Sequence, residues 1–482
     1  MASHNASGHN EEHHAEGMYV PFTSQREVVN DLVTKHDKIS DKWLSGVAAA
    51  GFLLVLGVIG FVMRVNDGVS DRMVWAYYAM MFSFILTTAS AAPMVAIAPR
   101  LANAHWRRPV SRVAELWSAA GIFSLLLFIP MLWILPPLTD GRRSLWFYNS
   151  DDPFFSKVPV YSPHIWTTAA LLSLAALGIM LLWLSAMPDL ALMREHSTGW
   201  KQKWSARLSG RWIGTTEQWN MLHHRMGIVG ALYFMMLVFV HYLVSTDFLM
   251  TLVPGWIDSL YPLTHAANSL QAGVATVILT MFFLRKFGGY EDYFTLDQFW
   301  AMSKLLFALS LLWFWFWFSS FNVFWYGKKP SEQAVLKYLM VGSYQPAFMA
   351  GFILSFVTPL LVMMWNRVRK SFWGPTIMSV AVLAGTFFDR LRLYVAAWSY
   401  PGVGDYRVDK HEIPFDSIPA ANMPGVPDVL IVLGVIGGAV LFYLLAARLI
   451  PPVSIWEQKE LMLYKLHKAY HRTEVLVLGK PR

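Results

Sequence analysis

The stretch HIWTTAALLSLAALGIMLLWLSAM, residues 164–187, decides the class of fold. It contains no Asp, Glu, Lys or Arg. A hydrocarbon core about 30 Å thick needs roughly 20 consecutive apolar residues for each helical crossing. The stretch is long enough and apolar enough to predict a transmembrane helix.

Nine further apolar stretches of similar length follow the same pattern. They cover residues 43–63, 73–98, 113–138, 226–249, 260–284, 300–326, 346–366, 372–397 and 427–450. None shows the alternation of a membrane β-strand, and only helices or closed barrels satisfy their backbone hydrogen bonds in lipid. The sequence therefore predicts an all-α membrane protein with about ten transmembrane helices.

The composition supports this fold class. The chain has 482 residues, of which 55% are hydrophobic and 15% are charged, whereas soluble domains carry roughly 25% charged residues. Ten spans with their loops leave no room for a large soluble domain. The chain has no cysteine, which excludes thiolate-held iron–sulfur clusters, c-type haem attachment, disulfides and cysteine nucleophiles within it.

The N-terminal residues 1–42 are polar and lack the apolar run of a signal peptide. Four histidines in this leader could bind a metal ion: His4, His9, His13 and His14. A solvated leader is the more ordinary interpretation of such a composition. We expect no metal site in the chain.

The distribution of positive charge predicts the orientation. With ten spans both termini lie on one side, and that side carries 26 of the 39 Lys and Arg residues. The positive-inside rule then places both termini in the cytoplasm, which suits the inner membrane of a bacterium. This bias and attraction to anionic lipids explain the net charge of +8 without any nucleic acid partner.

Two connections between the predicted spans are unusually long. Residues 188–225 combine cationic and Trp side chains and are expected to lie partly on the membrane surface. Residues 400–427 are rich in Pro and Gly on the outer side. They are interpreted either as a docking loop for a partner or as an ordinary connector.

Ionisable residues inside spans are costly, at about 2.5 to 3.5 kcal/mol each on insertion scales, and are therefore expected to be functional or paired. Those in or at the ends of the predicted spans are Glu115, Asp140, Arg142, His164, His241, Asp247, His265, Lys304, Asp389, Arg390 and Arg392. Most fall toward the outer face, whereas Glu115 and Lys304 lie toward the cytoplasm. A polar cluster near one face with a sparser set below it suits a quinone site coupled to a proton route.

Other interpretations of these residues stay open. Asp389 and Arg390 could form a structural ion pair, and each histidine a satisfied interhelical hydrogen bond. His164, His241 and His265 have comparable predicted depth, as the ligands of a b-type haem would. A two-haem cytochrome needs four such histidines at two depths, and the inner halves of the spans have none.

Five strings in order along the chain resemble the NrfD/PsrC family of quinone-interacting membrane subunits. They are HWRRPVSRVAE (105–115), MPDLALMREH (187–196), HYLVSTDFLMTLVPGWIDSLYP (241–262), YGKKP (326–330) and FFDRLRLYVAAW (387–398). The order, spacing and ten-span topology are most similar to ActC and ActF, the longer members found in bacterial alternative complex III.

The resemblance implies two four-helix bundles with one flanking helix on each side. The implied divisions are a cytoplasmic leader (1–42), a flanking helix and loop (43–72), a quinone-binding bundle (73–259), a proton-path bundle (260–399), an outer loop (400–426), a last flanking helix (427–450) and a cytoplasmic tail (451–482).

The resemblance also implies the function. Menaquinol or ubiquinol would bind near the periplasmic face as substrate, and electrons would pass to a periplasmic iron–sulfur subunit. Further expected partners are c-type cytochromes, a second NrfD-like subunit and lipids. No haem, cluster or metal is expected in this chain. The candidate quinone site is Asp140, Arg142, Trp146 and His164, and the candidate proton path is Glu115, His241, Asp247, His265, Lys304, Asp389 and Arg390.

The chain departs from the quinol-oxidising pattern at two positions. Thr139 stands where a His is expected before Gly-Arg, and Thr167 where an Asp is expected. Asp140 and His164 lie one and three residues away and could replace them as proton acceptors. The alternative is an ActF-like subunit that moves protons or acts as a scaffold without its own quinone site. A transporter would need a second helix break to match Ala91, Ala92 and Pro93, and no such break is evident in the sequence.

Overall fold

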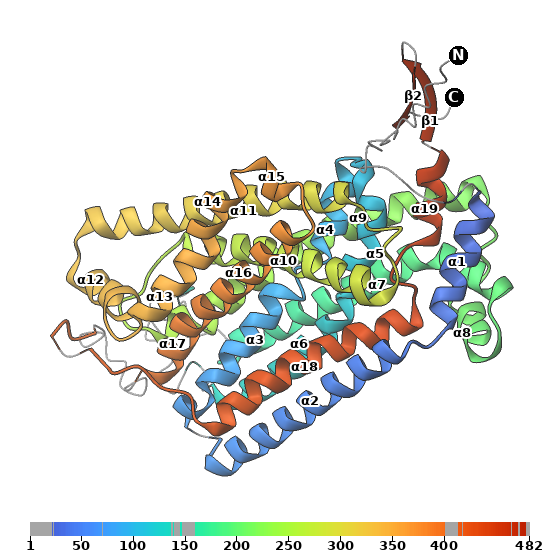
Figure 1. Ribbon diagram of the computed structural model, residues 1–482. Coiled ribbons are helices and arrows are strands. Elements are labelled where there is room, and N and C mark those ends of the chain that lie inside the picture. Colours follow the sequence, from blue (N-terminus) through green and yellow to red (C-terminus); the bar gives the residue numbers. More distant parts are fainter. Residues whose placement is uncertain are drawn as a thin grey trace, which may run out of the picture.

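The computed structural model describes residues 22, 24–69, 71–135, 138, 145–146, 160–400, 413–416, 418–463, 465–470 and 473–478, the last two ranges by their backbone alone. Long helices lie side by side in one bundle (Figure 1). The all-α membrane class predicted from the sequence is confirmed.

The helices and strands follow one another in this order. The α-helices are α1 (Gln25–Asp37), α2 (Asp41–Asp67), α3 (Ala76–Thr88), α4 (Met94–Leu101), α5 (Arg108–Leu116), α6 (Ser118–Ile134), α7 (Ser162–His196), α8 (Gly199–Ser209), α9 (Thr216–Asp247), α10 (Tyr261–Gly288), α11 (Leu296–Gly327), α12 (Pro330–Leu336), α13 (Gln345–Phe352), α14 (Thr358–Met363), α15 (Asn366–Arg369), α16 (Trp373–Arg390), α17 (Ala396–Ser399), α18 (Val426–Leu449) and α19 (Ile455–Leu463). Short 3₁₀ turns are η1 (Arg72–Trp75), η2 (His105–Arg107) and η4 (Met250–Leu252), π-helical turns are η5 (Lys337–Val341), η6 (Ile353–Val357) and η7 (Leu391–Val395), and the strands are β1 (Lys465–Tyr470) and β2 (Thr473–Leu478).

Eight helical segments in the described part of the chain are long and apolar enough to cross a membrane. They are Asp41–Asp67, His105–Ile134, Ser162–His196, Thr216–Leu252, Tyr261–Phe287, Leu296–Gly327, Gln345–Met363 and Val426–Leu449. The chain is therefore a multi-pass membrane protein. The two other predicted spans, 73–98 and 372–397, are also helical, but each is interrupted, so the count of ten stays a prediction.

The first interruption separates α3 from α4 within the predicted span 73–98. The chain forms turns from residue 89 to Pro93, and the carbonyl of Ser90 accepts a 2.5 Å hydrogen bond from the Tyr233 hydroxyl. A Cβ atom on Gly273 would lie 2.9 Å from the backbone of this turn, so α10 can approach only because that residue is glycine. The break is tolerated in the bundle because neighbouring helices cover the turn and supply hydrogen-bond partners for backbone groups that the helix no longer pairs.

Two π-helical turns interrupt the later spans. Turn η6 joins α13 to α14 just before Pro359, and turn η7 joins α16 to α17 just after Arg390. Each inserts extra backbone into a helix and re-aims the side chains around it, which is why such turns occur often at functional sites. The sequence analysis did not foresee either turn.

The first and last predicted spans pack tightly against each other as α2 and α18 (Figure 1). A Cβ atom added to Gly57 would lie 2.5 Å from the Cα atom of Gly434, and one added to Gly60 would lie 2.7 Å from the carbonyl of Pro427. Small residues at a helix contact let the two backbones approach, and dispersion then holds them together in lipid.

We predict that Gly57→Ala destabilises the protein because the new methyl group would press into the α18 backbone. Overpacking of this kind typically costs about 1–3 kcal/mol. The matched control is Gly51→Ala on the same helix, where a Cβ atom would meet nothing within 4 Å. Thermal unfolding in detergent measures both variants, and equal unfolding temperatures would refute the close packing.

One end of the bundle carries α1, α8 and α19, and is called the α19 end; the opposite end, which carries α12 and residues 413–416 and 418–425, is called the α12 end (Figure 1). Residues 25–37 of the predicted polar leader form a docked helix, α1, started by a capping box between Ser24 and Glu27. The buried residues Val28 and Leu32 fasten it to the bundle. The prediction of a solvated leader is therefore wrong for residues 25–37. The four histidines of the leader lie outside the described residues.

The C-terminal tail holds the only β-strands in the described part of the chain. Strands β1 and β2 form an antiparallel hairpin in which Lys465 pairs with Leu478 and Tyr470 with Thr473. The hairpin projects beyond α19 (Figure 1). The described part of the 400–427 loop is anchored to the bundle, since Asn422 bonds Tyr344 and Ser399.

His36 fastens α1 to the α19 end. Its backbone carbonyl accepts hydrogen bonds from Lys201 and Arg448, each 2.5 Å long. Burial, together with the charges of Lys201 and Arg448, lowers the pKa of the His36 imidazole to about 3. While α1 is docked, the imidazole ring of His36 is therefore neutral at any pH above about 3.

We predict that acid releases α1. The detached His36 would bind a proton below its ordinary pKa of about 6.5 whereas the docked form would not, so docking weakens as pH falls from about 6.5 toward 3, by up to about tenfold per pH unit. Hydrogen exchange of residues 24–38, corrected for the intrinsic pH dependence, measures this. His36→Leu should remove the pH dependence, and an identical decline in both proteins would contradict the assignment.

Candidate functional site

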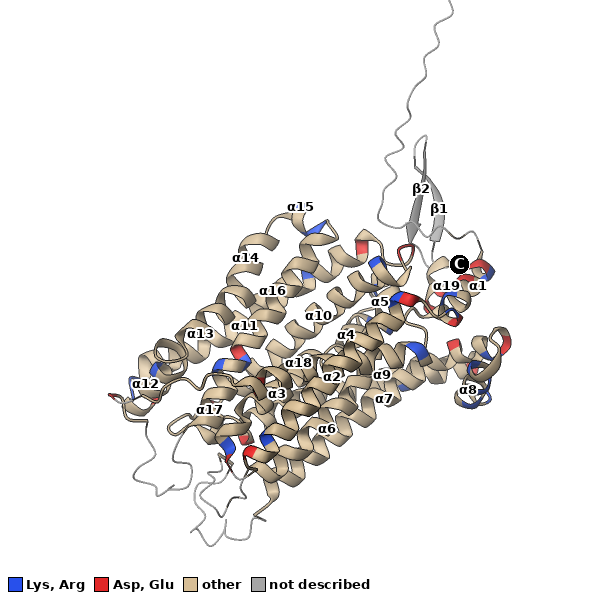
Figure 2. Cartoon of the chain, turned by 60° about the horizontal axis from the view of Figure 1, so that its bottom comes forward, with Lys and Arg blue, Asp and Glu red and all other residues tan. Residues whose placement is uncertain are grey.

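Lys, Arg, Asp and Glu residues gather toward the two ends of the bundle, and the helices between have few of them (Figure 2). The start of α7, the end of α9, the start of α10 and the end of α16 meet in the half toward the α12 end. These elements carry His164, Asp247, His265 and Asp389. Most of the predicted site residues that the structure describes therefore lie in one half of the bundle.

The Asp247 carboxylate holds two tryptophans at the end of α9. It is buried, and it accepts hydrogen bonds from the indole N–H groups of Trp146 (2.8 Å) and Trp166 (3.0 Å). The ring centroids of the two indoles lie 6.1 Å apart. The predicted quinone-site residue Trp146 and the predicted proton-path residue Asp247 thus belong to one cluster, and the sequence analysis missed Trp166.

His164 lies beside this cluster at the first turn of α7, which begins at Ser162 and Pro163. Its Nε2 donates a 3.2 Å hydrogen bond to the carbonyl of Leu135, and its ring packs 6.1 Å from that of Phe248. Because Nε2 carries the proton in this bond, Nδ1 is the basic nitrogen of the neutral ring. The arrangement suits a proton acceptor.

Several positions that the sequence assigned to or compared with the quinone site lie outside the described part of the chain. These are Asp140, Arg142 and Thr139. Their contribution to the quinone site stays a prediction. Thr167, which stands where an Asp is expected, is fully buried on α7.

His241 and His265 form a direct pair deeper in the bundle. Their Nδ1 atoms lie 2.8 Å apart, both rings are buried, and one of the two nitrogens must carry the shared proton. His265 Nε2 in turn lies 3.2 Å from the hydroxyl of Tyr394 and 3.4 Å from that of Ser83. His241 precedes Asp247 by six residues on α9, and each residue of an α-helix rises about 1.5 Å. The histidine pair therefore lies about 9 Å from the tryptophan cluster along the axis of α9.

Three charged residues lie at the junction of α16 and the π-helical turn η7: Asp389, Arg390 and Arg392. Arg390 and Arg392 have different partners. Asp389 accepts hydrogen bonds from Arg392 Nη2 (2.7 Å) and Nε (3.0 Å), whereas Arg390 Nη2 lies 3.9 Å from it. Arg390 instead donates to Asn268 (2.5 Å) and to the Tyr261 hydroxyl (3.4 Å). The predicted pairing of Asp389 with Arg390 is therefore secondary to the pairing with Arg392.

Uncharged polar residues continue this network across the second half of the bundle. Asn268 donates to Gln271 (3.3 Å), and Gln271 donates to Ser310 (2.8 Å) and to the carbonyl of Ser355 (2.7 Å). These amides are not among the residues that the sequence predicted for the site. Their spacing of three residues within a span was the signal that could have found them.

Glu115 belongs to a separate cluster at the α19 end. It pairs with Arg100 (2.8 Å) and Arg112 (3.3 Å), and Arg112 also pairs with Asp189 (3.0 Å). Glu457 of α19 pairs with Arg100 (3.2 Å) and Arg107. The structure does not join Glu115 to the histidine pair, so a proton path through both clusters stays a prediction.

The same cluster ties α19 to the bundle. Although burial alone would raise the pKa of Glu457, Arg107 and Arg100 together hold it below its ordinary value. Asp189 accepts from the backbone N–H of Trp456 (2.8 Å) and from Ser454 (3.1 Å). The sequence analysis did not single out Asp189 or Glu457 as site residues.

Lys304 stands apart from the other predicted residues. Its Nζ lies 3.4 Å from the centroid of the Trp300 ring, one turn earlier on α11. This cation–π contact satisfies the charge near the helix start. In the part of the chain that the structure describes, no three His, Asp or Glu residues are arranged as metal ligands.

These observations define the class of protein: a multi-pass helical membrane protein with a buried polar network in the half of the bundle toward one end. The family model described as polysulphide reductase NrfD matches residues 65–401. The chain belongs to the NrfD family, whose members are generally quinone-interacting membrane anchors of redox complexes and partner with iron–sulfur subunits. A comparison with curated proteins gave no match.

We predict that Arg112→Leu strongly destabilises the protein because it leaves Asp189 buried without its cation and removes one of the two cations that pair with Glu115. Removing one partner of a buried pair costs about 3–5 kcal/mol. Lys329→Ala is the control, since its side chain is 72% exposed and its pair with Glu332 spans 3.9 Å, and an exposed pair contributes less than about 1 kcal/mol. Comparable denaturant midpoints for the two variants would contradict the structural role.

Proposed function

We propose that this chain is the quinol-binding membrane subunit of a multi-subunit quinol:acceptor oxidoreductase similar to alternative complex III. Quinol binds near the α12 end of the first half of the bundle, beside His164. The observation that supports this most is the cluster of Asp247, Trp146 and Trp166 next to His164, above the His241–His265 pair.

The proposed site combines this cluster with Asp140 and Arg142 to supply the groups that quinol oxidation needs. Two electrons and two protons must leave each quinol as it becomes quinone, so the site needs proton acceptors and an apolar surface for the ring. His164 accepts one hydroxyl proton at Nδ1, and Asp140 accepts the other. Trp146 supplies an aromatic wall, and Arg142 holds the headgroup or the partner.

Protons then reach the interior through the polar network. The His241–His265 pair transfers a proton by exchanging which Nδ1 carries it, because the two nitrogens share one hydrogen bond. Tyr394 and Ser83 extend the route from His265. Asp389 and Arg390 continue it into the second half of the bundle, and Glu115 and Lys304 lie toward its far end.

The electrons leave to other subunits. The chain has no cysteine, so it cannot hold a thiolate-bound cluster, and we propose no haem or metal in it either. An iron–sulfur subunit docks at the α12 end on the periplasmic side and passes electrons to c-type cytochromes. The complex lies in a bacterial inner membrane, with the α19 end in the cytoplasm and a second NrfD-like subunit alongside.

One observation favours a second candidate function. Thr167, where quinol-oxidising relatives are expected to have an Asp, is fully buried and cannot act as a carboxylate base. This suits the ActF-like alternative, in which the chain moves protons or holds partners and the quinone site lies in the second copy.

The test is His164→Ala in the intact complex. We expect quinol oxidation to fall by about 10²-fold or more, which is the usual contribution of a positioned acid or base. His223→Ala is the control because this histidine is exposed and belongs to the start of α9, at the α19 end. Turnover and bound quinone that survive in an intact complex would favour the ActF-like alternative.

A further inference from the structure

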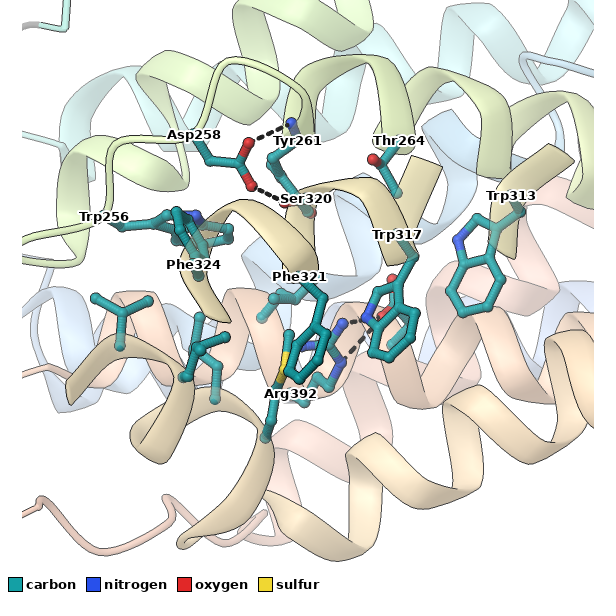
Figure 3. A pocket seen from close by; sticks show the side chains of 16 residues that line it. Trp256, Asp258, Tyr261, Thr264, Trp313, Trp317, Ser320, Phe321, Phe324 and Arg392 are labelled. Carbon is teal, nitrogen blue, oxygen red and sulfur yellow. Dashed lines mark hydrogen bonds and ion pairs between the residues drawn. The ribbon is translucent and has the colours of Figure 1, made fainter. Parts of the chain in front are cut away.

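A second candidate ligand site lies in the other half of the bundle. A cavity of about 40 Å³ is enclosed by α10, α11, η5, η7 and the loop before α10. Its lining includes Trp317, Phe321, Asp258, Tyr261, Asp389 and Arg392 (Figure 3). One water molecule needs about 10–15 Å³ of such space, so the cavity holds a few waters as it stands, and an aromatic headgroup enters only when the side chains that line it move apart.

The wall formed by α11 is aromatic and borders the lipid-facing surface of that helix. Trp313, Trp317 and Phe321 line the cavity, while Trp315 and Trp325 on the same helix are 64% and 58% exposed. Trp317 also stacks on Phe321, with ring centroids 5.6 Å apart. The lining therefore offers ring faces against which a planar apolar ligand can lie.

Two hydrogen-bond donors in this cavity have no partner among the described residues. They are Nη1 of Arg392, a side chain that is only 5% exposed, and Nε1 of Trp317, which is also buried. A buried donor without a partner costs about 1–3 kcal/mol. Both donors would be satisfied by acceptor oxygens on a bound ligand.

The charges around the cavity favour a neutral ligand over an anion. The Asp389 carboxylate neutralises Arg392 through two hydrogen bonds to its Oδ1 atom. Asp258 accepts from Ser320, from the Leu260 N–H (2.9 Å) and from the Tyr261 N–H (3.1 Å). A phosphate would meet both of these acidic side chains, whereas a carbonyl oxygen would not be repelled.

We propose that this cavity binds the headgroup of a quinone, a planar conjugated ring with two carbonyl oxygens, as a site distinct from the one at His164. The carbonyl oxygens accept hydrogen bonds from Arg392 and Trp317, and the ring lies against the aromatic wall of α11. In the dihydroxy form, a hydroxyl donates to the Oδ2 atom of Asp389. The inference rests on the proposed function in taking a quinone as the ligand.

The position of the cavity connects it to the buried network. Tyr261 lines the cavity, and its hydroxyl accepts a hydrogen bond from Arg390 Nη1 (3.4 Å). Its ring centroid also lies 6.0 Å from that of His265. A headgroup bound here would therefore contact the polar network to which the His241–His265 pair belongs.

The test uses the purified full complex and a photoreactive azidoquinone, with the labelled peptides mapped by mass spectrometry. We expect labelling of α11 and of residues 388–395. Trp317→Phe keeps the aromatic wall and removes one donor, so it should weaken azidoquinone binding at this site by about tenfold. Trp315→Phe is the matched control on the exposed face of the same helix.

Arg392→Lys provides a second variant that keeps the charge opposite Asp389 but removes the planar donor. It should lower labelling to a similar extent, with assembly of the complex checked by size-exclusion chromatography. Labelling that is equal in Trp317→Phe and Trp315→Phe, or that is displaced by phospholipid and not by unlabelled quinone, would overturn the proposal.

His164→Ala separates this inference from the proposed function. If both are right, that variant loses turnover but keeps the label on α11. Labelling confined to residues 135–166 would overturn the second site and leave the proposed function standing. Labelling of α11 with unchanged turnover in His164→Ala would support the second site and remove the first.

Discussion

Hydrocarbon offers no hydrogen-bond partner, so each polar group inside this bundle must find one within the protein. The histidine pair, the Asp389–Arg392 pair and the amides of Asn268 and Gln271 all obey this constraint. Their hydrogen bonds cross from α9 to α10 and from α10 to α16, so the network also fastens the two predicted halves to each other. Chemistry and architecture thus depend on the same contacts.

Irregular backbone gives the network its shape. The turns between α3 and α4 bring Ser90 within reach of Tyr233, and Gly273 lets α10 approach them. The π-helical turn η7 follows Arg390 directly and separates the partners of Arg390 from those of Arg392. Such interruptions occur inside a bundle only where neighbouring helices cover the freed groups, so they mark places where the fold has been adapted to hold polar side chains.

The two ends of the bundle solve the problem of buried charge differently. At the α19 end, Arg100, Arg107 and Arg112 are closely matched by carboxylates, and these pairs tie α19 to the bundle. Toward the α12 end, the groups are fewer, several are neutral, and the donors of Arg392 and Trp317 have no partner in the described chain. Some buried atoms of Arg100, Arg107 and Arg112 also lack partners in the described chain, so the two ends differ chiefly in their proportion of charged to neutral groups.

The sequence by itself determined the membrane class, the helical spans and the positions of the costly residues, because apolar length and ionisable side chains can be counted along a chain. It also offered a structural ion pair as one interpretation of Asp389 and Arg390, because ionisable side chains within spans are expected to be paired. Only the tertiary structure decided that Arg392 is the closer partner, that His241 meets His265, and that Asp247 gathers two tryptophans. Those contacts depend on the rotation and depth of packed helices, and on π-helical turns that no local pattern predicted.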